Sequence, residues 1–306
     1  MSLRPSALLL ACCTLFLSLG ASAEVKVLTS IKPLQLIAAA VQDGEGSPDV
    51  LLPPGASPHS YALRPSDVRR LREAQLFYWI GPDMEVFLGK PLQARQAPSV
   101  AVQELPGMHL RKFVNFEHMS HADYEDHDHD HRPGTLDAHL WLLPANAQAI
   151  AARMAEDLAI ADPLNAGRYQ ANLKAFDERM EQLDARLKQR LAPLVGKPYF
   201  VFHEAFDYFE EAYGLRHAGV FALSADVQPG AKHVAAMRAQ LQKAGPSCIF
   251  SEPPIRPRLA DTLSAGLPVQ LAELDDLGVA VKVDANGYEK LLGNLADEFA
   301  GCLEKL

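Results

Sequence analysis

The sequence predicts an α/β protein of two lobes, each with a parallel sheet covered by helices, joined by one long rigid helix. Three observations predict this class. Short β-rich runs alternate with helical patterns from Val25 onward. A single apolar stripe of helical period then runs through residues 162–195, and the alternation resumes after it. Because strands that alternate with helices form parallel sheets, we expect ligands to bind in the cleft between the two lobes.

Length and composition agree with this class. The chain has 306 residues, of which 48% are hydrophobic and 22% charged. Two lobes of this size bury a real core, so disorder is excluded for most of the chain. The formal net charge is −9, from 29 basic and 38 acidic residues. Since nucleic-acid backbones require a basic face, we expect no nucleic-acid partner, whereas small cations suit an acidic chain rich in histidine.

Residues 1–23 have the pattern of a secretory signal peptide. Arg4 precedes an apolar run from Ala7 to Leu19, and small residues follow it up to Ala23. The run is about 13 residues long, whereas a membrane-spanning helix needs roughly 20. We therefore expect cleavage after Ala23 and an exported, soluble mature protein. An N-terminal membrane anchor is the alternative interpretation.

The first lobe is expected over residues 24–161. Its strands are predicted at residues 25–29, 50–52, 76–80 and 99–102, and its helices at 31–41 and from Pro65 onward. Ser66 is the expected cap of the second helix, because a serine hydroxyl can accept a hydrogen bond from an unpaired N–H of the first turn.

Residues 115–132 interrupt this alternation and have no core-forming periodicity. They contain six acidic residues and five histidines, namely His118, His121, His127, His129 and His131. We expect an exposed, mobile loop that binds metal ions weakly, because ordering a loop costs conformational entropy that a preformed site avoids. The loop would capture an ion at the mouth of the cleft, or act as a brake when the ion is plentiful. A solvated acidic loop with incidental affinity is the alternative.

The linking helix is expected over residues 162–195, with Asp162 as cap and Pro163 in its first turn. Its apolar positions recur every three or four residues: Tyr169, Leu173, Phe176, Met180, Leu183, Leu187 and Leu191. This stripe is short for a coiled-coil dimer. We therefore expect a stiff helix that packs along both lobes of a monomer.

The second lobe is expected over residues 196–306. Strands are predicted at residues 199–202, 220–223, 248–250 and 269–274, and helices at 204–213, 231–244, 257–265 and 288–303. Cleavage of the signal removes Cys12 and Cys13 and leaves Cys248 and Cys302. A lone pair of cysteines in an oxidising compartment is most simply a disulfide, with two free buried thiols as the alternative.

Three histidines lie at strand ends or in the turns that follow them, where parallel sheets place ligand groups. His59 follows the strand and turn 51–58, His139 lies in an apolar setting after the histidine-rich loop, and His203 closes the strand 199–202. Neutral imidazoles suit zinc, and three of them leave one position of a tetrahedral site open.

A water or a carboxylate would fill the fourth position. Asp275, which closes the strand 269–274, is the leading protein candidate, and its neighbour Asp276 is the second. The alternative for both is a helix cap, or an acceptor that orients an imidazole N–H. Glu204 directly follows His203 and is a further candidate for such an orienting role.

Four segments resemble the ligand motifs of the metal-binding substrate-binding proteins of bacterial ABC transporters, the cluster A-I family. They are Leu52-Pro-Pro-Gly-Ala-Ser-Pro-His-Ser-Tyr61 with Arg64-Pro-Ser-Asp67, Asp137-Ala-His-Leu-Trp141, Phe202-His-Glu-Ala-Phe206 and Leu274-Asp-Asp-Leu-Gly278. They occur in the right order, and the resemblance covers the chain from about Val25 to Leu306. The acidic histidine loop before the second motif is similar to that of the zinc-uptake branch, as is the pair Cys248 and Cys302.

This resemblance implies a periplasmic zinc-binding protein, not an enzyme, that delivers Zn²⁺ to a membrane permease driven by an ATPase. It implies His59, His139 and His203 as ligands. Some members of the zinc branch have a glutamate directly before the first histidine, where this chain has Pro58. A water, or Asp275 as in manganese-type members, is therefore the expected fourth ligand.

Other functions remain as alternatives at this point. A manganese or iron importer component would use the same fold. A secreted zinc hydrolase would need a general base, for which Glu204 beside His203 is available, but the sequence has neither an HExxH nor a GxSxG motif. An adhesin that uses the same scaffold is the third alternative.

Overall fold

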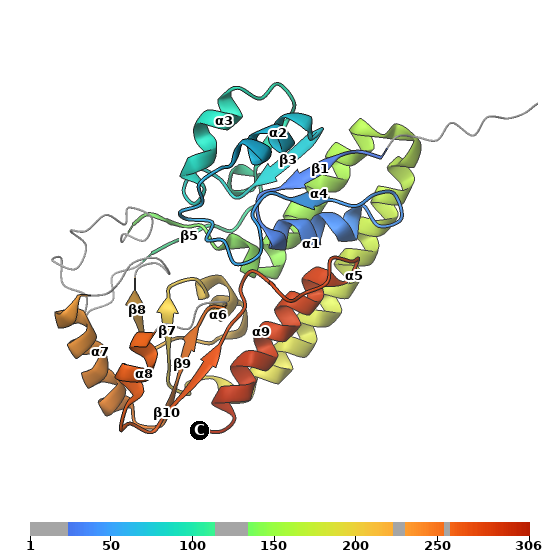
Figure 1. Cartoon of the computed structure of the whole chain (residues 1–306). Helices are drawn as coiled ribbons and strands as arrows, with labels where there is room; N and C mark the ends of the chain where they lie inside the picture. Colours follow the sequence, from blue (N-terminus) through green and yellow to red (C-terminus); the bar gives the residue numbers. More distant parts are fainter. Residues whose placement is uncertain (1–23, 114–133, 223–229, 254–257) are drawn as a thin grey trace, which may run out of the picture.

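The computed structural model describes residues 24–113, 134–222, 230–253 and 258–306. The expected signal peptide (1–23) and the histidine-rich loop (115–132) lie outside the described residues. Two four-stranded parallel sheets form separate lobes, one above the other, and one long helix runs along the side of both (Figure 1). The predicted fold class is confirmed.

The first sheet has the strand order β2-β1-β3-β4, and all its pairs are parallel. Its strands are β1 (Val27–Thr29), β2 (Asp49–Val50), β3 (Leu76–Trp79) and β4 (Ser99–Ala101). In the central register, Leu28 is paired with both Asp49 and Phe77. Strands β1 and β3 are buried along their whole length, which is why they occur in the sequence as continuous apolar runs.

Short helices surround this sheet. They are α1 (Lys32–Val41), α2 (Pro65–Glu73), α3 (Gly89–Gln93) and the 3₁₀ turns Val86–Leu88 and Val102–Glu104. Helix α2 begins one residue before Ser66, so the prediction of Ser66 as its cap was wrong. Instead, Asp67 Oδ2 accepts a 2.9 Å hydrogen bond from the backbone N–H of Arg64, which fastens the first turn to the preceding residue.

A helix that the sequence analysis did not predict follows the antiparallel pair β5 (Arg111–Lys112) and β6 (Leu136–Asp137). After a 3₁₀ turn at Leu140–Leu142, α4 runs over Pro144–Ala161. Its signal was present in the sequence, because Pro144 suits the first turn and buried apolar residues recur at helical spacing. These residues are Ala147, Ile150, Ala151, Met154, Ala155 and Leu158.

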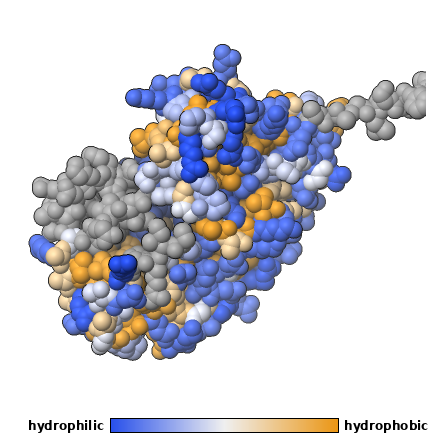
Figure 2. Space-filling view, viewed as in Figure 1, coloured by the Kyte–Doolittle hydropathy of each residue, from blue (hydrophilic) through white to orange (hydrophobic). Residues whose placement is uncertain are grey.

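The predicted linking helix consists of α5 (Ala166–Leu191) with a 3₁₀ turn at each end, at Pro163–Asn165 and Ala192–Leu194. Its stripe is buried except for Leu173, which is partly exposed. Helix α5 packs against α4 and α1 of the first lobe and against α9 of the second. The opposite side is polar, and Figure 2 shows mostly hydrophilic residues over the face where α5 and α9 lie.

The second sheet has the order β10-β9-β7-β8, again parallel throughout. Its strands are β7 (Tyr199–His203), β8 (Gly219–Ala222), β9 (Ser247–Ser251) and β10 (Val269–Glu273). Its helices are α6 (Asp207–Tyr213), α7 (Ala231–Ala244), α8 (Arg258–Ser264) and α9 (Gly287–Leu303). The disulfide predicted between Cys248 and Cys302 ties β9 to α9, with a Cα–Cα distance of 6.3 Å.

Residues alternate between the two faces of β7. Phe200 and Phe202 belong to a small core under α7 and α8, whereas Tyr199 and Val201 belong to a core that continues into the first lobe. That shared core also includes Phe299 of α9. Because one continuous core joins the lobes, bending them apart would expose apolar surface.

None of the described helices is both long and apolar enough to cross a membrane.

Candidate metal centre

Three histidines converge from separate parts of the fold. His59 lies in the turn segment between β2 and α2, His139 follows β6, and His203 is the last residue of β7. The side chains of His139 and His203 are almost fully buried, at 1% and 5% exposure. The first two come from the first lobe and the third comes from the second, so the site lies between the lobes.

The distances among these rings suit a single small ion. The ring centroids of His59 and His139 are 5.4 Å apart, those of His59 and His203 5.3 Å, and those of His139 and His203 4.9 Å. One ligand nitrogen from each ring lies within 4.8 Å of the others. Zinc–nitrogen bonds of about 2.0–2.1 Å require donor atoms somewhat closer than this, a difference that small side-chain rotations cover.

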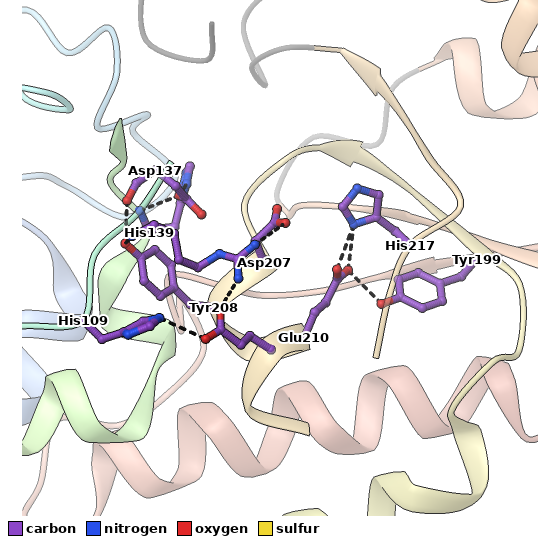
Figure 3. Close-up of polar contacts among 10 residues, drawn as sticks. His109, Asp137, His139, Tyr199, Asp207, Tyr208, Glu210 and His217 are labelled. Atoms are coloured by element: carbon purple, nitrogen blue, oxygen red, sulfur yellow. Dashed lines mark hydrogen bonds and ion pairs between the residues drawn. The ribbon is translucent and has the colours of Figure 1, made fainter. Parts of the chain in front are cut away.

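Asp137 orients the second histidine. Its Oδ1 lies 2.8 Å from His139 Nδ1 and also accepts a 3.0 Å hydrogen bond from the backbone N–H of His139, as Figure 3 shows. An imidazole that donates Nδ1–H to a carboxylate has its Nε2 directed to the metal. Burial raises the pKa of Asp137 well above its ordinary value, and the charge of Asp207 adds to this effect.

Glu252 plays a comparable part for the third histidine. It directly follows β9, and its Oε2 lies 3.5 Å from His203 Nδ1. Burial raises its pKa to about 8, while the charge of His59 acts in the opposite direction. The sequence analysis missed this residue, although its position at the carboxyl end of a strand is the signal that identified His203.

The structure does not bring Asp275 into the histidine group: among the described residues, its carboxylate is not one of the donors that lie mutually within 4.8 Å. Asp275 Oδ2 lies 3.5 Å from the backbone N of Ala280, and its own N–H donates to Glu298 Oε2 at 3.0 Å. Both contacts are within the second lobe.

Asp276 lies at the boundary between the lobes. Its backbone oxygen accepts a 2.9 Å hydrogen bond from Trp141 Nε1, and the Tyr288 hydroxyl donates to the backbone oxygen of Trp141 at 2.5 Å. Burial raises the pKa of the Asp276 carboxyl well above the ordinary value, and the charge of Glu252 raises it further. Together with the 2.7 Å bond from Lys32 Nζ to the Val279 oxygen, these contacts hold the two lobes together beside the histidines.

Glu204, the other residue considered for an orienting role, points elsewhere. It is 3% exposed, and one of its carboxylate oxygens belongs to a second group with Asp207 and His217. Burial raises its pKa to about 9, reinforced by the charges of Asp207 and Asp137.

Comparison with known proteins adds to this geometry. Residues 27–302 match the family described as zinc-uptake complex component A, periplasmic. The chain is 39% identical over 293 residues to the high-affinity zinc uptake system protein ZnuA of Yersinia pestis, covering 92% of each chain. It is 36% identical over 323 residues to the protein of the same name from Paracoccus denitrificans, covering 98% of this chain and 99% of the relative.

Solved structures share the fold. A crystal structure of ZnuA superimposes with a TM-score of 0.76 at 22% identity, covering 92% of this chain and 99% of the other. The laminin-binding adhesin of Streptococcus agalactiae gives a TM-score of 0.73 at 20% identity, covering 90% and 99%.

Proposed function

Because the chain belongs to the family of periplasmic zinc-uptake components, we propose that it captures Zn²⁺ with high affinity and delivers it to an ABC importer. Zinc is the cargo in this scheme and not a resident cofactor. The observation that carries the proposal is the convergence of three imidazole rings, from both lobes, around one point.

We assign His59, His139 and His203 as the zinc ligands. Three neutral nitrogen donors match the borderline softness of zinc better than that of manganese, which prefers oxygen ligands. The carboxyl groups of Asp137 and Glu252 lie close to Nδ1 of two of the rings, where each can hold the tautomer that leaves Nε2 for the metal. The manganese or iron alternative is therefore not favoured.

A water is our proposed fourth ligand. Pro58 offers no side-chain donor, and the contacts of Asp275 with Ala280 and Glu298 engage it locally. Water leaves the ion exchangeable, which suits a protein that must release its cargo.

Release requires a conformation with weaker coordination, which docking on the permease would favour. The shared core and α5 support small displacements of the lobes over a wide hinge motion. A shift of His203 relative to His59 and His139 by about one ångström would already weaken a site that depends on metal–ligand bonds of about 2 Å.

The remaining assignments follow from this role. We propose export to the periplasm by a cleaved signal peptide (1–23), lobes over residues 24–161 and 196–306 with the linking helix at 162–195, and a monomer that docks on a permease and its ATPase subunit. We assign no catalytic residue. The segment 115–132, with His118, His121, His127, His129 and His131, would be an auxiliary site that binds zinc weakly.

Zinc uptake in cells tests the function. In a strain that has only this importer, His59→Ala should abolish growth in chelator-treated medium, and added zinc should restore it. His233→Ala is the matched control, since His233 is a buried histidine of α7 whose Nε2 lies 3.0 Å from the Val220 oxygen, outside the histidine group. Equal growth of the His59→Ala and parental strains, at equal protein levels, would refute the proposal.

A further inference from the structure

A second group of metal-capable side chains lies in the second lobe. Glu204 follows β7, Asp207 begins α6, and His217 precedes β8. One ligand atom from each lies within 4.8 Å of the other two. None of the three belongs to the histidine group, so the proposed zinc site does not account for this arrangement.

Two oxygens in this group lack a hydrogen-bond partner although they are buried. They are Glu204 Oε1 and Asp207 Oδ2. Glu204 as a whole is only 3% exposed. An unsatisfied carboxylate oxygen in a buried place costs free energy, which a bound cation would recover.

A carboxylate orients the ring of His217, as one often does for a metal-binding histidine. Its Nδ1 lies 2.9 Å from each carboxylate oxygen of Glu210, and the Tyr199 hydroxyl donates to Glu210 Oε1 at 2.7 Å. This pairing repeats the relation between Asp137 and His139 at the first site. Figure 3 shows the two pairs on either side of Asp207.

Acidic side chains outnumber basic side chains here. The carboxylates of Asp137, Glu204, Asp207 and Glu210 act electrostatically on one another. Among the described residues, the cations that act on this set are Arg111, which is 3.2 Å from Asp207 Oδ1, and His217 when it is protonated. Arg111 also forms an ion pair with Glu211, so its positive charge is divided between two carboxylates. A divalent cation would favour the ionised form of these carboxyl groups and balance their charge.

We propose that Glu204, Asp207 and His217 form a second site for a divalent transition-metal ion, distinct from the three-histidine site. One imidazole and two carboxylates are a donor set that zinc accepts, with a water completing the coordination. The donors must close by about 1 Å from their present separations to reach normal bond lengths. Glu210 and Tyr199 hold the imidazole in place while this happens.

Metal stoichiometry of the full mature chain tests this site. The five histidines of segment 115–132 are first changed to asparagine, so that zinc bound there is not counted. This parent should bind about two Zn²⁺ per chain in equilibrium dialysis, and His217→Gln or Asp207→Asn should each reduce the number to about one. Glutamine can still donate to Glu210, and asparagine preserves the shape of aspartate, so both variants should fold.

Two controls separate this site from the first. His233→Gln, a buried histidine of the same lobe, should leave the stoichiometry unchanged. His59→Ala should remove the other ion only. A parent that binds about one Zn²⁺, or folded His217→Gln and Asp207→Asn variants that still bind two, would overturn the second site. A His59→Ala variant that keeps both ions would instead refute the first site and leave the second standing.

Discussion

His139 and Asp137 form a buried pair in which the imidazole Nδ1 lies 2.8 Å from the carboxylate Oδ1, and each side chain is 1% exposed. The Asp-x-His spacing brings the two side chains together within one short segment, which the fold then buries. The same carboxylate also accepts the backbone N–H of His139, so it fixes the ring and the backbone together.

Loss of this carboxylate should weaken zinc binding without removing it. We expect Asp137→Ala to lower zinc affinity about 10–100-fold, because the ring of His139 loses the group that sets its tautomer and orientation. Competition against a chromogenic chelator measures the change. Asp297→Ala, at a side chain that is 78% exposed on α9, is the control. A folded Asp137→Ala protein with parental affinity would contradict this role.

Zinc affinity should fall with pH, because protons compete with the metal for imidazole nitrogen. From pH 7.5 to 5.5 we expect the dissociation constant to rise at least about tenfold, since an ordinary imidazole titrates near 6.5. The measurement is chelator competition at constant ionic strength. Constant affinity across this range would exclude ligation by histidine.

Glu85 should make stability depend on pH. It is fully buried, and burial raises its pKa from 4.5 to about 7. The folded chain therefore holds this proton more tightly than the unfolded chain, so the contribution of Glu85 to the unfolding free energy falls as pH rises from about 4.5 to about 7. Its Oε2 accepts a 2.6 Å hydrogen bond from the Ile80 N–H, which a glutamine oxygen can also accept.

Glu85→Gln should accordingly be more stable than the parent at pH 8, by about 2 kcal/mol, and little different at pH 4.5. Urea denaturation at both pH values measures this difference. An equal effect of the substitution at the two pH values would show that Glu85 does not titrate as described.

The disulfide should stabilise the second lobe without contributing to the metal site. Cys248 and Cys302 are 54 residues apart, and closing a loop of that length restricts the unfolded chain by about 4 kcal/mol in the chain-entropy model. We expect Cys248→Ala with Cys302→Ala to lower the unfolding free energy by about 2–4 kcal/mol and to leave zinc affinity unchanged. Loss of zinc binding in the folded double variant would contradict this separation.

The order of strands and helices could be predicted from the sequence, because the spacing of apolar residues and the positions of turn residues are local signals. The buried strands are continuous apolar runs, and the stripe from Tyr169 to Leu191 is long. Helix α4 was overlooked because many of its buried positions are alanines, which produce a weaker apolar stripe than leucine or phenylalanine does. The cap of α2 was misplaced because Ser66 and Asp67 are adjacent and both can accept an N–H.

The three histidines of the site could be named in advance because parallel sheets place ligands at strand ends. Their mutual distances could not be predicted, since His59, His139 and His203 are far apart in sequence. The same rule suggested Asp275, which lies two residues after β10 and is engaged by Ala280 and Glu298. The roles of Glu252 and His217 could not be predicted, because their partners, His203 and Glu210, become neighbours only in the folded chain.

Calorimetric titration of the metal-stripped chain (residues 24–306) with Zn²⁺, repeated on His59→Ala, tests the central claim most directly. The five histidines of segment 115–132 are replaced in both proteins, and His217→Gln removes the proposed second site from both. We predict a tight binding event in the parent that is weakened more than about 100-fold in His59→Ala, a larger loss than removal of an orienting residue causes. Equally tight zinc binding by the two proteins would show that the three converging imidazoles do not hold the ion.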